Sequence, residues 1–390
     1  MKSVWRIPIA SALALLLVSF LLIGLHKNGQ AANSPAVQKW EIALTTIEDT
    51  SAESYSNTRS LNIVGGNVYL FTDFSNSSYR VFSTTAKTWT VDHSSTVITQ
   101  MLEGYASGVL SDTIYVLGGV NVSHTYQGDV WKFSPISNTW SRGDSEATTP
   151  ILGGRAGGSF TGAPSRGELL AFGGSPPFTP AGDEVWRYNP ATTLWTTSNM
   201  PNPDGDRPGH SAGVIGDRLY LVGGVTPPSG NFVQAVTLDG SMFPSVYITG
   251  TQSPTPRTYP ATVFDSQNNR IYVFGGKSIT SSAAMTDTWY LSLGTGIWNR
   301  LPDLPQPLTN THAAGWYNTA FKSTVNSEDF FVPIEILLVG DQINNGTTIS
   351  YVYDEYQMDY EQIAIPADFS IYLPFIIRNY GGAARYYRID

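Results

Sequence analysis

Short apolar segments rich in aromatic and β-branched residues recur along this chain of 390 residues, and polar turns with glycine, asparagine or proline separate them. Segments of five or six such residues bounded by turn residues are typical of β-strands. The pattern therefore predicts an all-β protein. Several of the apolar segments end in a pair of glycines, and this pair marks a longer repeat.

Three copies of the repeat are nearly complete. Each has an apolar strand ending in Gly-Gly, then an acidic residue, an aromatic strand, a short turn and a tryptophan. The second glycine and the tryptophan lie 21, 21 and 22 residues apart in these copies. Such a regular interval predicts a repeated structural unit. The shared positions are Gly118, Gly119 and Trp140, then Gly173, Gly174 and Trp195, then Gly275, Gly276 and Trp298.

Three further copies are less complete. Gly223 and Gly224 keep the glycine pair, but no tryptophan follows at the expected distance. In the first and last copies Asp73 and Asp341 stand where the second glycine is expected. The six copies recur at intervals of about 50 residues, which is the length of one kelch repeat.

Over residues 36–365 the sequence resembles the kelch-repeat family, because the glycine pair, the aromatic strand and the tryptophan recur together. The resemblance implies a six-bladed kelch-type β-propeller of four-stranded antiparallel blades. A single sheet leaves both faces uncovered, whereas sheets packed in a ring bury each other's faces. Glycine after an inner strand permits a positive φ and a close approach of neighbouring backbone.

The kelch resemblance also implies how the ring closes. Trp40 to Leu44 has the pattern of an outer strand with no inner strands before it, and we expect it to join the blade of about residues 310–360. Residues 360–365 compete for the same place. The stretch from Trp298 to Gly340 is longer than its counterparts, which predicts an insertion, either a long functional loop or a longer hairpin.

The N-terminal segment has the order of a secretory signal peptide. Two basic residues precede an apolar run at residues 7–25, and small residues follow. We expect residues 1–31 to be cleaved; an uncleaved membrane anchor through residues 7–25 and a buried core helix are the alternatives. Either of the first two outcomes places the remaining chain outside the cytoplasmic membrane, secreted or at the cell surface.

Residues 366–390 differ in style from the repeats and form a C-terminal tail. The tail resembles Tyr-Leu-Pro-apolar-Arg tails of secreted bacterial proteins. Surface retention, packing on the propeller and disorder are three open alternatives for it.

Charge and cysteine content exclude several functions. The formal net charge is −9 with no run of Lys or Arg, so a nucleic-acid partner is not expected. The absence of cysteine excludes disulfides, Cys-ligated zinc and thiol nucleophiles. It also excludes the Tyr–Cys copper centre of galactose-oxidase-like kelch enzymes.

No constellation of residues has the spacing of a catalytic or metal centre, so we predict no catalytic residues, metal or cofactor. His210 and His312 fall in equivalent places ahead of their glycines, which favours a structural role. Asp73 and Asp341 are candidates for functional carboxylates at the rim of the central channel, and a local turn is the simpler alternative. Residues 202–206 have acidic spacing that suggests calcium but lack the downstream Glu, which favours a turn. Three Asn-x-Ser/Thr sequons occur, at Asn76, Asn121 and Asn345.

The leading functional hypothesis is a non-enzymatic binding module for a protein or glycan partner, held by loops on one face of the propeller. One alternative is a sugar-modifying enzyme resembling kelch-fold sialic acid epimerases, which would need acid and base side chains converging in the central channel. A second alternative is a structural cell-surface protein.

Overall fold

The structure of this chain is a computed structural model, and it describes just under three fifths of the residues. The described ranges are 40–47, 59–71, 78–90, 93–94, 104–121, 123, 125–144, 153–174, 184–201, 207–224, 233–239, 242–243, 253–317, 334–343, 348–354, 377–378 and 384–385. Asp73, the calcium candidate at 202–206, the predicted segment at 1–31 and all of the predicted tail at 366–390 except 377–378 and 384–385 lie outside these ranges.

The described strands form six antiparallel sheets that follow one another along the chain. Blade 1 consists of β2 (Ser60–Val64), β3 (Asn67–Phe71), β4 (Ser78–Ser83) and β5 (Thr88–Trp89), with the short β6 (His93–Ser94) beside β4. Blade 2 consists of β7 (Ala106–Leu110), β8 (Thr113–Leu117), β9 (Val130–Ser134) and β10 (Thr139–Asp144). Blade 3 consists of β11 (Ser159–Ala163), β12 (Glu168–Phe172), β13 (Glu184–Asn189) and β14 (Leu194–Pro201). Blade 4 consists of β15 (His210–Ile215), β16 (Arg218–Gly223), β17 (Val233–Thr237) and β18 (Met242–Phe243). Blade 5 consists of β20 (Ala261–Asp265), β21 (Arg270–Phe274), β23 (Thr288–Ser292) and β24 (Ile297–Leu301). Blade 6 consists of β25 (Leu308–Tyr317), β26 (Ile334–Gln342), β27 (Thr348–Asp354) and β1 (Trp40–Ile47).

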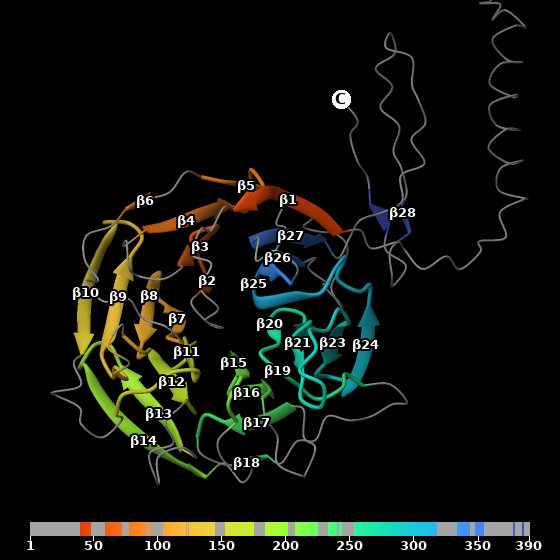
Figure 1. The fold of residues 1–390 in the computed structure, drawn as a ribbon. Helices are drawn as coiled ribbons and strands as arrows, with labels where there is room; N and C mark the ends of the chain where they lie inside the picture. The colour runs from red at the N-terminus through yellow and green to blue at the C-terminus, as the bar shows by residue number, and fades with distance from the viewer. Residues whose placement is uncertain are drawn as a thin grey trace, which may run out of the picture. The chain divides into compact units, whose positions relative to one another are not determined.

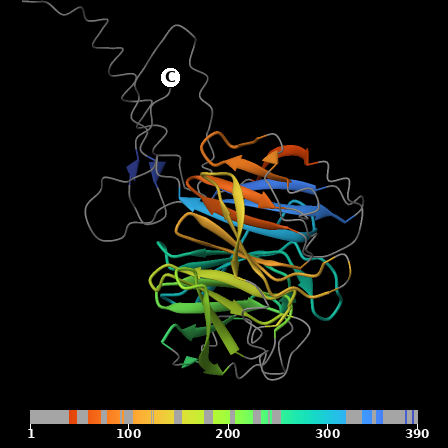
Figure 2. The ribbon, with the colours of Figure 1, turned by 90° about the vertical axis from the view of Figure 1, so that its left-hand side faces the viewer.

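The blades are arranged in a ring around a central channel. The inner strands β2, β7, β11, β15, β20 and β25 each contact the next one, and β25 contacts β2. Figure 1 looks down this ring, and Figure 2 shows the blades from the side as stacked sheets. The fold is therefore the six-bladed β-propeller of four-stranded antiparallel blades that the sequence predicted.

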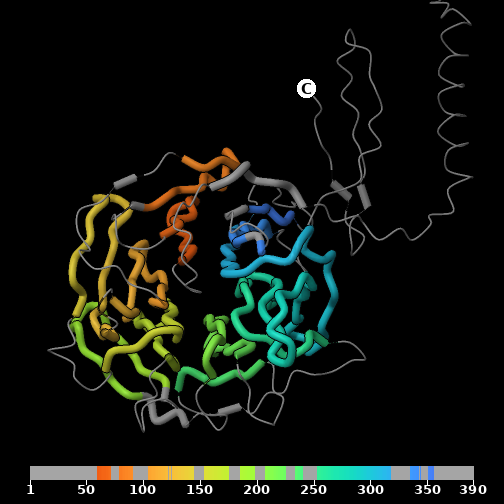
Figure 3. Tube along the Cα trace, viewed as in Figure 1, coloured from red at the N-terminus to blue at the C-terminus, as the bar shows by residue number. Residues whose placement is uncertain are grey.

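A strand from the N-terminal side completes the last blade. β1 pairs with β27, with Trp40 opposite Tyr353 and Ile42 opposite Tyr351. The first and last parts of the propeller consequently lie side by side, as the colours of Figure 3 show. The predicted closure is confirmed, and the competing residues 360–365 lie outside the described ranges.

The glycine pairs make the contacts between blades. All eight paired glycines have positive φ, from 52° at Gly275 to 105° at Gly174. A Cβ on Gly118 would lie 2.4 Å from the carbonyl oxygen of Arg155 in the next blade, closer than real Cβ atoms come. The neighbouring Gly119 N–H donates to that same carbonyl at 2.7 Å. The glycines thus allow two backbones to meet where a side chain would separate them.

Aromatic side chains fill the spaces between blades. Trp195 and Trp298 are buried, and Trp140 is partly buried against its neighbours. Trp195 packs on Tyr188 with ring centroids 5.1 Å apart, and its Nε1 donates to Asp144 of blade 2 at 2.8 Å. Blade 4 has no tryptophan at this position, and its outer strand β18 has only two residues.

The two faces of the ring differ in their connections. Each inner strand begins on the face where the antiparallel second strand ends in its glycines. Ser159 lies opposite Phe172, the residue before Gly173, and His210 lies opposite Gly223. We call this face the glycine face. The opposite face carries the connections from each inner strand to the second strand. Residues 318–333, between β25 and β26, lie outside the described ranges, so the insertion predicted between Trp298 and Gly340 stays a prediction.

Two small sheets complete the described structure. β19 (Arg257–Thr258) pairs with β22 (Lys277–Ser278), and β28 (Ile377–Arg378) pairs with β29 (Ala384–Arg385). Within the described residues, no helix has the length and apolar character needed to cross a membrane.

A candidate binding cavity in the central channel

The described part of the channel encloses a cavity of about 210 Å³ on the glycine face. All six blades contribute the residues at or just before the start of their inner strands. The side chains are mostly hydroxyls and small apolar groups, with one guanidinium and two imidazoles. The polar and aromatic members are Arg59, Ser60, Tyr105, Ser107, Ser159, Phe160, His210, Ser211, Tyr259, Thr262, Thr311 and His312.

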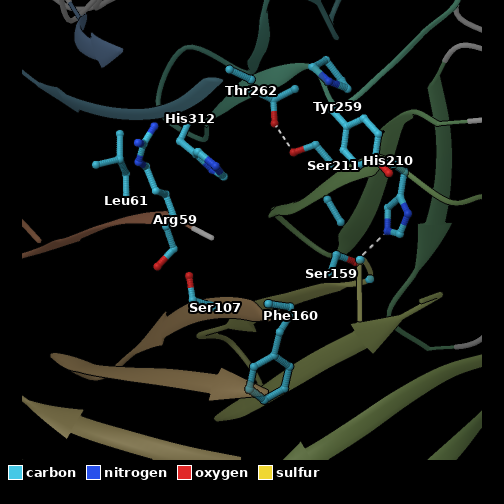
Figure 4. Close-up of a pocket in the computed structure, with 18 of the residues that line it drawn as sticks. Arg59, Leu61, Ser107, Ser159, Phe160, His210, Ser211, Tyr259, Thr262 and His312 are labelled. Atoms are coloured by element: carbon cyan, nitrogen blue, oxygen red, sulfur yellow. Dashed lines mark hydrogen bonds between the residues drawn. The ribbon is translucent and has the colours of Figure 1, made fainter. Parts of the chain in front are cut away.

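Hydrogen bonds between neighbouring inner strands hold several of these side chains. Ser211 Oγ lies 2.5 Å from Thr262 Oγ1, which joins blades 4 and 5 (Figure 4). Ser107 Oγ donates to Asn62 Oδ1 at 3.1 Å, which joins blades 2 and 1. These links fix the cavity wall because each one ties a side chain to the adjacent blade.

His210 joins blade 4 to blade 3. Its Nδ1 lies 2.7 Å from the carbonyl oxygen of Arg207, which can only accept, so Nδ1 carries the proton. Its Nε2 is then an acceptor and lies 2.8 Å from Ser159 Oγ, which donates (Figure 4). Burial lowers the pKa of His210 to about 4, so the imidazole is neutral at pH 7.

His312 lies across the cavity beside Arg59 (Figure 4). Its Nε2 is buried and makes no hydrogen bond among the described residues. Burial and the nearby Arg59 charge lower the pKa of His312 to about 4, against an opposing effect of Asp341. His312 is thus a neutral ring with a polar atom that a ligand could satisfy.

The two histidines are not equivalent, which corrects the sequence interpretation. His210 pairs with Gly223, the first glycine of its repeat. His312 pairs with Val339, the residue before Gly340, so it occupies the register of Ser211. An irregularity between Thr309 and His312 accompanies this offset, and such irregularities between strands are invisible in sequence spacing.

Asp341 is buried beside the channel and does not line the cavity. Its Oδ1 accepts a hydrogen bond from Arg59 at 2.5 Å, and its Oδ2 accepts one from Asn310 at 2.9 Å. The carboxylate therefore binds its own chain, as part of the junction between blades 1 and 6.

Tyr259 is held in an unfavourable backbone conformation at the cavity. Its φ is 51°, in the left-handed region, where bulky residues are uncommon. The residues entering the inner strands of blades 2, 3 and 4 also have positive φ, and there they are Gly104, Gly157 and Gly209. The Tyr259 ring packs on Gly209, where a Cβ would come within 3.1 Å of it. This strain could not be predicted from the sequence, because no motif marks it.

Buried arginines on the glycine face are a second feature that sequence reasoning missed. Arg257 is fully buried and donates to the Gly275 carbonyl at 2.9 Å and to both carboxylate oxygens of Asp287 at 2.8 and 2.6 Å. Arg155 donates to the Gly173 carbonyl at 3.0 Å. Arg155, Arg207 and Arg257 precede three of the four glycine pairs, and this recurrence was the available signal for side chains that are structural.

The other candidate positions contribute less. The structural glycines lie next to the cavity and the tryptophans lie on outer strands, away from it. Among the described residues no group of His, Cys, Asp or Glu could hold a metal ion. Asn121 Oδ1 accepts hydrogen bonds from the Ser123 and Thr125 amides, both at 3.0 Å, and Asn76 and Asn345 lie outside the described ranges.

The chain belongs to the kelch-repeat family. Residues 104–321 match the family model described as the KLHDC2/KLHL20/DRC7 Kelch-repeats domain. This result agrees with the glycine pairs, the aromatic strands and the six blades.

Several known proteins are similar to this chain. Acyl-CoA-binding domain-containing protein 4 of Arabidopsis thaliana is 26% identical over 54% of this chain and 32% of its own length. Kelch domain-containing protein 3 of Rattus norvegicus is 24% identical over 53% of this chain and 55% of its own length. Kelch-like protein 35 of Mus musculus is 28% identical over 52% of this chain and 31% of its own length. The matches thus span between a third and about half of these relatives. A solved structure of YjhT has a TM-score of 0.57 and 14% identity over 80% of this chain and 96% of its own, which shows a shared fold.

Proposed function

We propose that this chain is an extracytoplasmic binding module that holds a partner on the glycine face, with the central cavity as the anchoring point. Kelch propellers are typically protein-binding modules, and a protein partner is the first candidate. A glycan is the second, because the cavity combines hydroxyl groups with an aromatic ring. Binding, with no chemical turnover, is the role for which the scaffold is suited.

Tyr259 is the observation that carries the proposal. A non-glycine residue in a left-handed conformation costs about 1 kcal/mol or more, and such strain tends to persist at functional sites. Three blades of this ring have glycine at the matching entry to the inner strand. A tyrosine there gives the cavity wall a large amphipathic surface, which is the type of side chain enriched among binding hot spots.

The cavity chemistry fits binding in a second way. Six blades supply hydroxyls, two neutral imidazoles and one guanidinium within one small space. The rival sugar-modifying enzyme of the epimerase kind requires acid and base side chains converging there. The described lining contains Arg59, His210 and His312 and, within those residues, no Asp or Glu.

The extracytoplasmic location rests on the apolar run at residues 7–25 with its basic residues before it. Cell fractionation with and without residues 369–390 tests whether the tail retains the protein at the surface, as the structural-protein alternative requires. Recovery of the full chain in the cytoplasm would contradict the location.

A binding experiment with matched variants tests the function. The full chain is screened against protein and glycan libraries, and the affinity of the captured partner is then measured for Tyr259→Gly and Thr193→Gly. Thr193 has φ 57° in an exposed turn on the opposite face, so it shares the backbone strain but not the cavity. We expect Tyr259→Gly to weaken binding roughly tenfold or more and Thr193→Gly to leave it unchanged.

Two results would contradict this function. One is equal affinity of the Tyr259→Gly variant and the unmodified chain for every captured partner. The other is turnover of a sugar substrate by the purified chain, which would favour the epimerase alternative.

A further inference from the structure

Ser159 and His210 have the geometry of a nucleophile and its base. Ser159 Oγ lies 2.8 Å from His210 Nε2, within reach for direct proton transfer. The Arg207 carbonyl oxygen accepts a hydrogen bond from His210 Nδ1 at 2.7 Å, and this bond fixes the tautomer in which Nε2 is an acceptor. A nucleophile, a base and a group that orients the base are the three parts of an activated serine.

The pair differs from the other polar links around the cavity. Ser211 meets the hydroxyl of Thr262, and Ser107 meets the amide oxygen of Asn62. A hydroxyl and an amide oxygen accept a hydrogen bond but do not take up a proton in water, whereas the neutral imidazole of His210 can. Among the described cavity residues, Ser159 is the one hydroxyl that donates to an imidazole.

Ser159 is partly buried and lines the cavity, and Gly157 and Gly158 precede it. A Cβ on Gly157 would meet nothing within 4 Å, so space is open on this side of the strand entry. Tyr259 lies on the same side of the cavity as His210 (Figure 4).

We propose that Ser159 is a nucleophile activated by His210 and that it accepts acyl groups from small carboxylic esters. A cavity of about 210 Å³ with mostly polar walls fits a short acyl chain better than a long one. This reactivity shares the cavity with the proposed partner binding but goes beyond it and needs no partner.

The chemistry balances with water as the second reactant. Oγ forms a bond to the ester carbonyl carbon while its proton passes to His210 Nε2. The ester C–O bond then breaks, the leaving alcohol takes the proton from Nε2, and the acyl group stays on Ser159. Water attacks the acyl-serine in the same way, and a carboxylic acid leaves as Oγ recovers its proton.

The second step should be slow, so the acyl-serine should accumulate. A neutral carbonyl orients His210, whereas efficient triads use a carboxylate that stabilises the imidazolium. Burial, and to a smaller extent the charge of Arg207, also disfavour a positive charge on the ring. We therefore expect a stoichiometric burst with little turnover.

The test uses the full chain with p-nitrophenyl acetate, followed by mass spectrometry of the acetylated peptide. We expect a burst of nitrophenol near one equivalent, with the acetyl group on Ser159. Ser159→Ala should abolish the burst, while Ser137→Ala, in the exposed turn between β9 and β10 and outside the cavity, should leave it intact. His210→Gln should slow it roughly a hundredfold. Three results would overturn the proposal: a burst of the same size in Ser159→Ala as in the unmodified chain, an acetyl group on another residue, or no burst at all.

A second pair of variants leaves His210 in place, so it tests the proposal even where His210→Gln does not fold. The chain has no cysteine, so Ser159→Cys and Ser211→Cys each carry one thiol at matching positions. Beside His210 the first thiol should react with iodoacetamide at neutral pH about tenfold faster than the second. Equal rates would show that His210 does not activate residue 159 and would likewise overturn the proposal.

Discussion

The guanidinium of Arg59 donates a hydrogen bond to the carboxylate of Asp341 at 2.5 Å, although 282 residues separate them. Arg59 immediately precedes β2 of blade 1, and Asp341 lies near the end of β26 of blade 6. Both residues are buried, with relative exposures of 7% and 9%. The ion pair thus joins the first blade to the last at the edge of the channel.

Other polar contacts reinforce the same junction. Lys87 forms an ion pair with the buried Glu335, which also accepts a hydrogen bond from Trp316 Nε1 at 2.9 Å. Trp89 Nε1 donates to Ser350 Oγ at 3.2 Å. Blades 1 and 6 are therefore joined by charged and polar groups in addition to their shared apolar core.

Replacing Asp341 should destabilise the ring strongly. Asp341→Asn keeps the size of the side chain but leaves the buried Arg59 charge without this partner, which typically costs about 3 kcal/mol. Chemical denaturation of the two proteins measures the difference in the free energy of unfolding. Asp303→Asn, in an exposed pair with Arg300, is the control and should change stability by less than about 0.5 kcal/mol. Equal effects of the two substitutions would contradict the assigned role of Asp341.

Removing the closing strand should lower the melting temperature sharply. Deletion of residues 36–46 takes away most of β1 and exposes the edge of β27, to which β1 is hydrogen-bonded. An uncovered edge loses ladder hydrogen bonds and becomes a template for aggregation. Thermal unfolding followed by circular dichroism is the measurement. A melting temperature equal to that of the full chain would show that β1 is not needed for closure.

Stability should fall as the pH is lowered from about 6.5 towards 4. The pKa of His312 is about 4 in the folded chain, below its ordinary value of 6.5, so between these values the unfolded chain binds a proton that the folded chain does not. The stabilisation is complete above the ordinary value and is lost progressively below it, by roughly 3 kcal/mol at most.

The His312→Gln variant isolates this effect from the titration of carboxylates. Denaturation at several pH values between 4 and 7.5 should show a shallower decline for the variant than for the unmodified chain. The charged groups facing His312 are Arg59 and Asp341, and both are retained in the variant. Parallel pH profiles would mean that His312 is not held neutral by the fold.

Adding one methyl group at Gly162 should be costly. Gly162 is in β11, and a Cβ there would lie 2.0 Å from the carbonyl oxygen of Val109 in β7. The backbones of blades 2 and 3 would have to separate, so Gly162→Ala should destabilise the fold by about 3 kcal/mol. Gly294→Ala is the matched control, because a Cβ at Gly294 meets nothing within 4 Å, and it should be nearly neutral. Denaturant midpoints of the two variants decide the question.

Much of the architecture could be predicted from the sequence because it is encoded locally. Each glycine pair follows an apolar strand and adopts a positive φ, and each blade spans about 50 residues. The six blades were predictable even where Asp73 and Asp341 replace a glycine, since the spacing and the strands persisted. The isolated strand at Trp40 pointed to the closure that β1 makes with β27.

The site was far less predictable because its parts come from different blades. The interpretation of His210 and His312 as equivalent was wrong by one register position, owing to an irregularity before His312. Ser159 stands in no motif and is one serine among many, so its role could not be predicted from the sequence. Only the approach of blade 3 to blade 4 places it against His210.

By itself, the amino-acid sequence determined the strand pattern, the repeat length and the glycine conformations, since these depend on neighbours within a few residues. Tertiary structure alone decided that Arg59 pairs with Asp341, that Ser159 meets His210, and that Tyr259 is strained over the cavity. The physical reason is the ring itself. It brings the entries of six inner strands to one channel, and the partners it selects there are far apart along the chain.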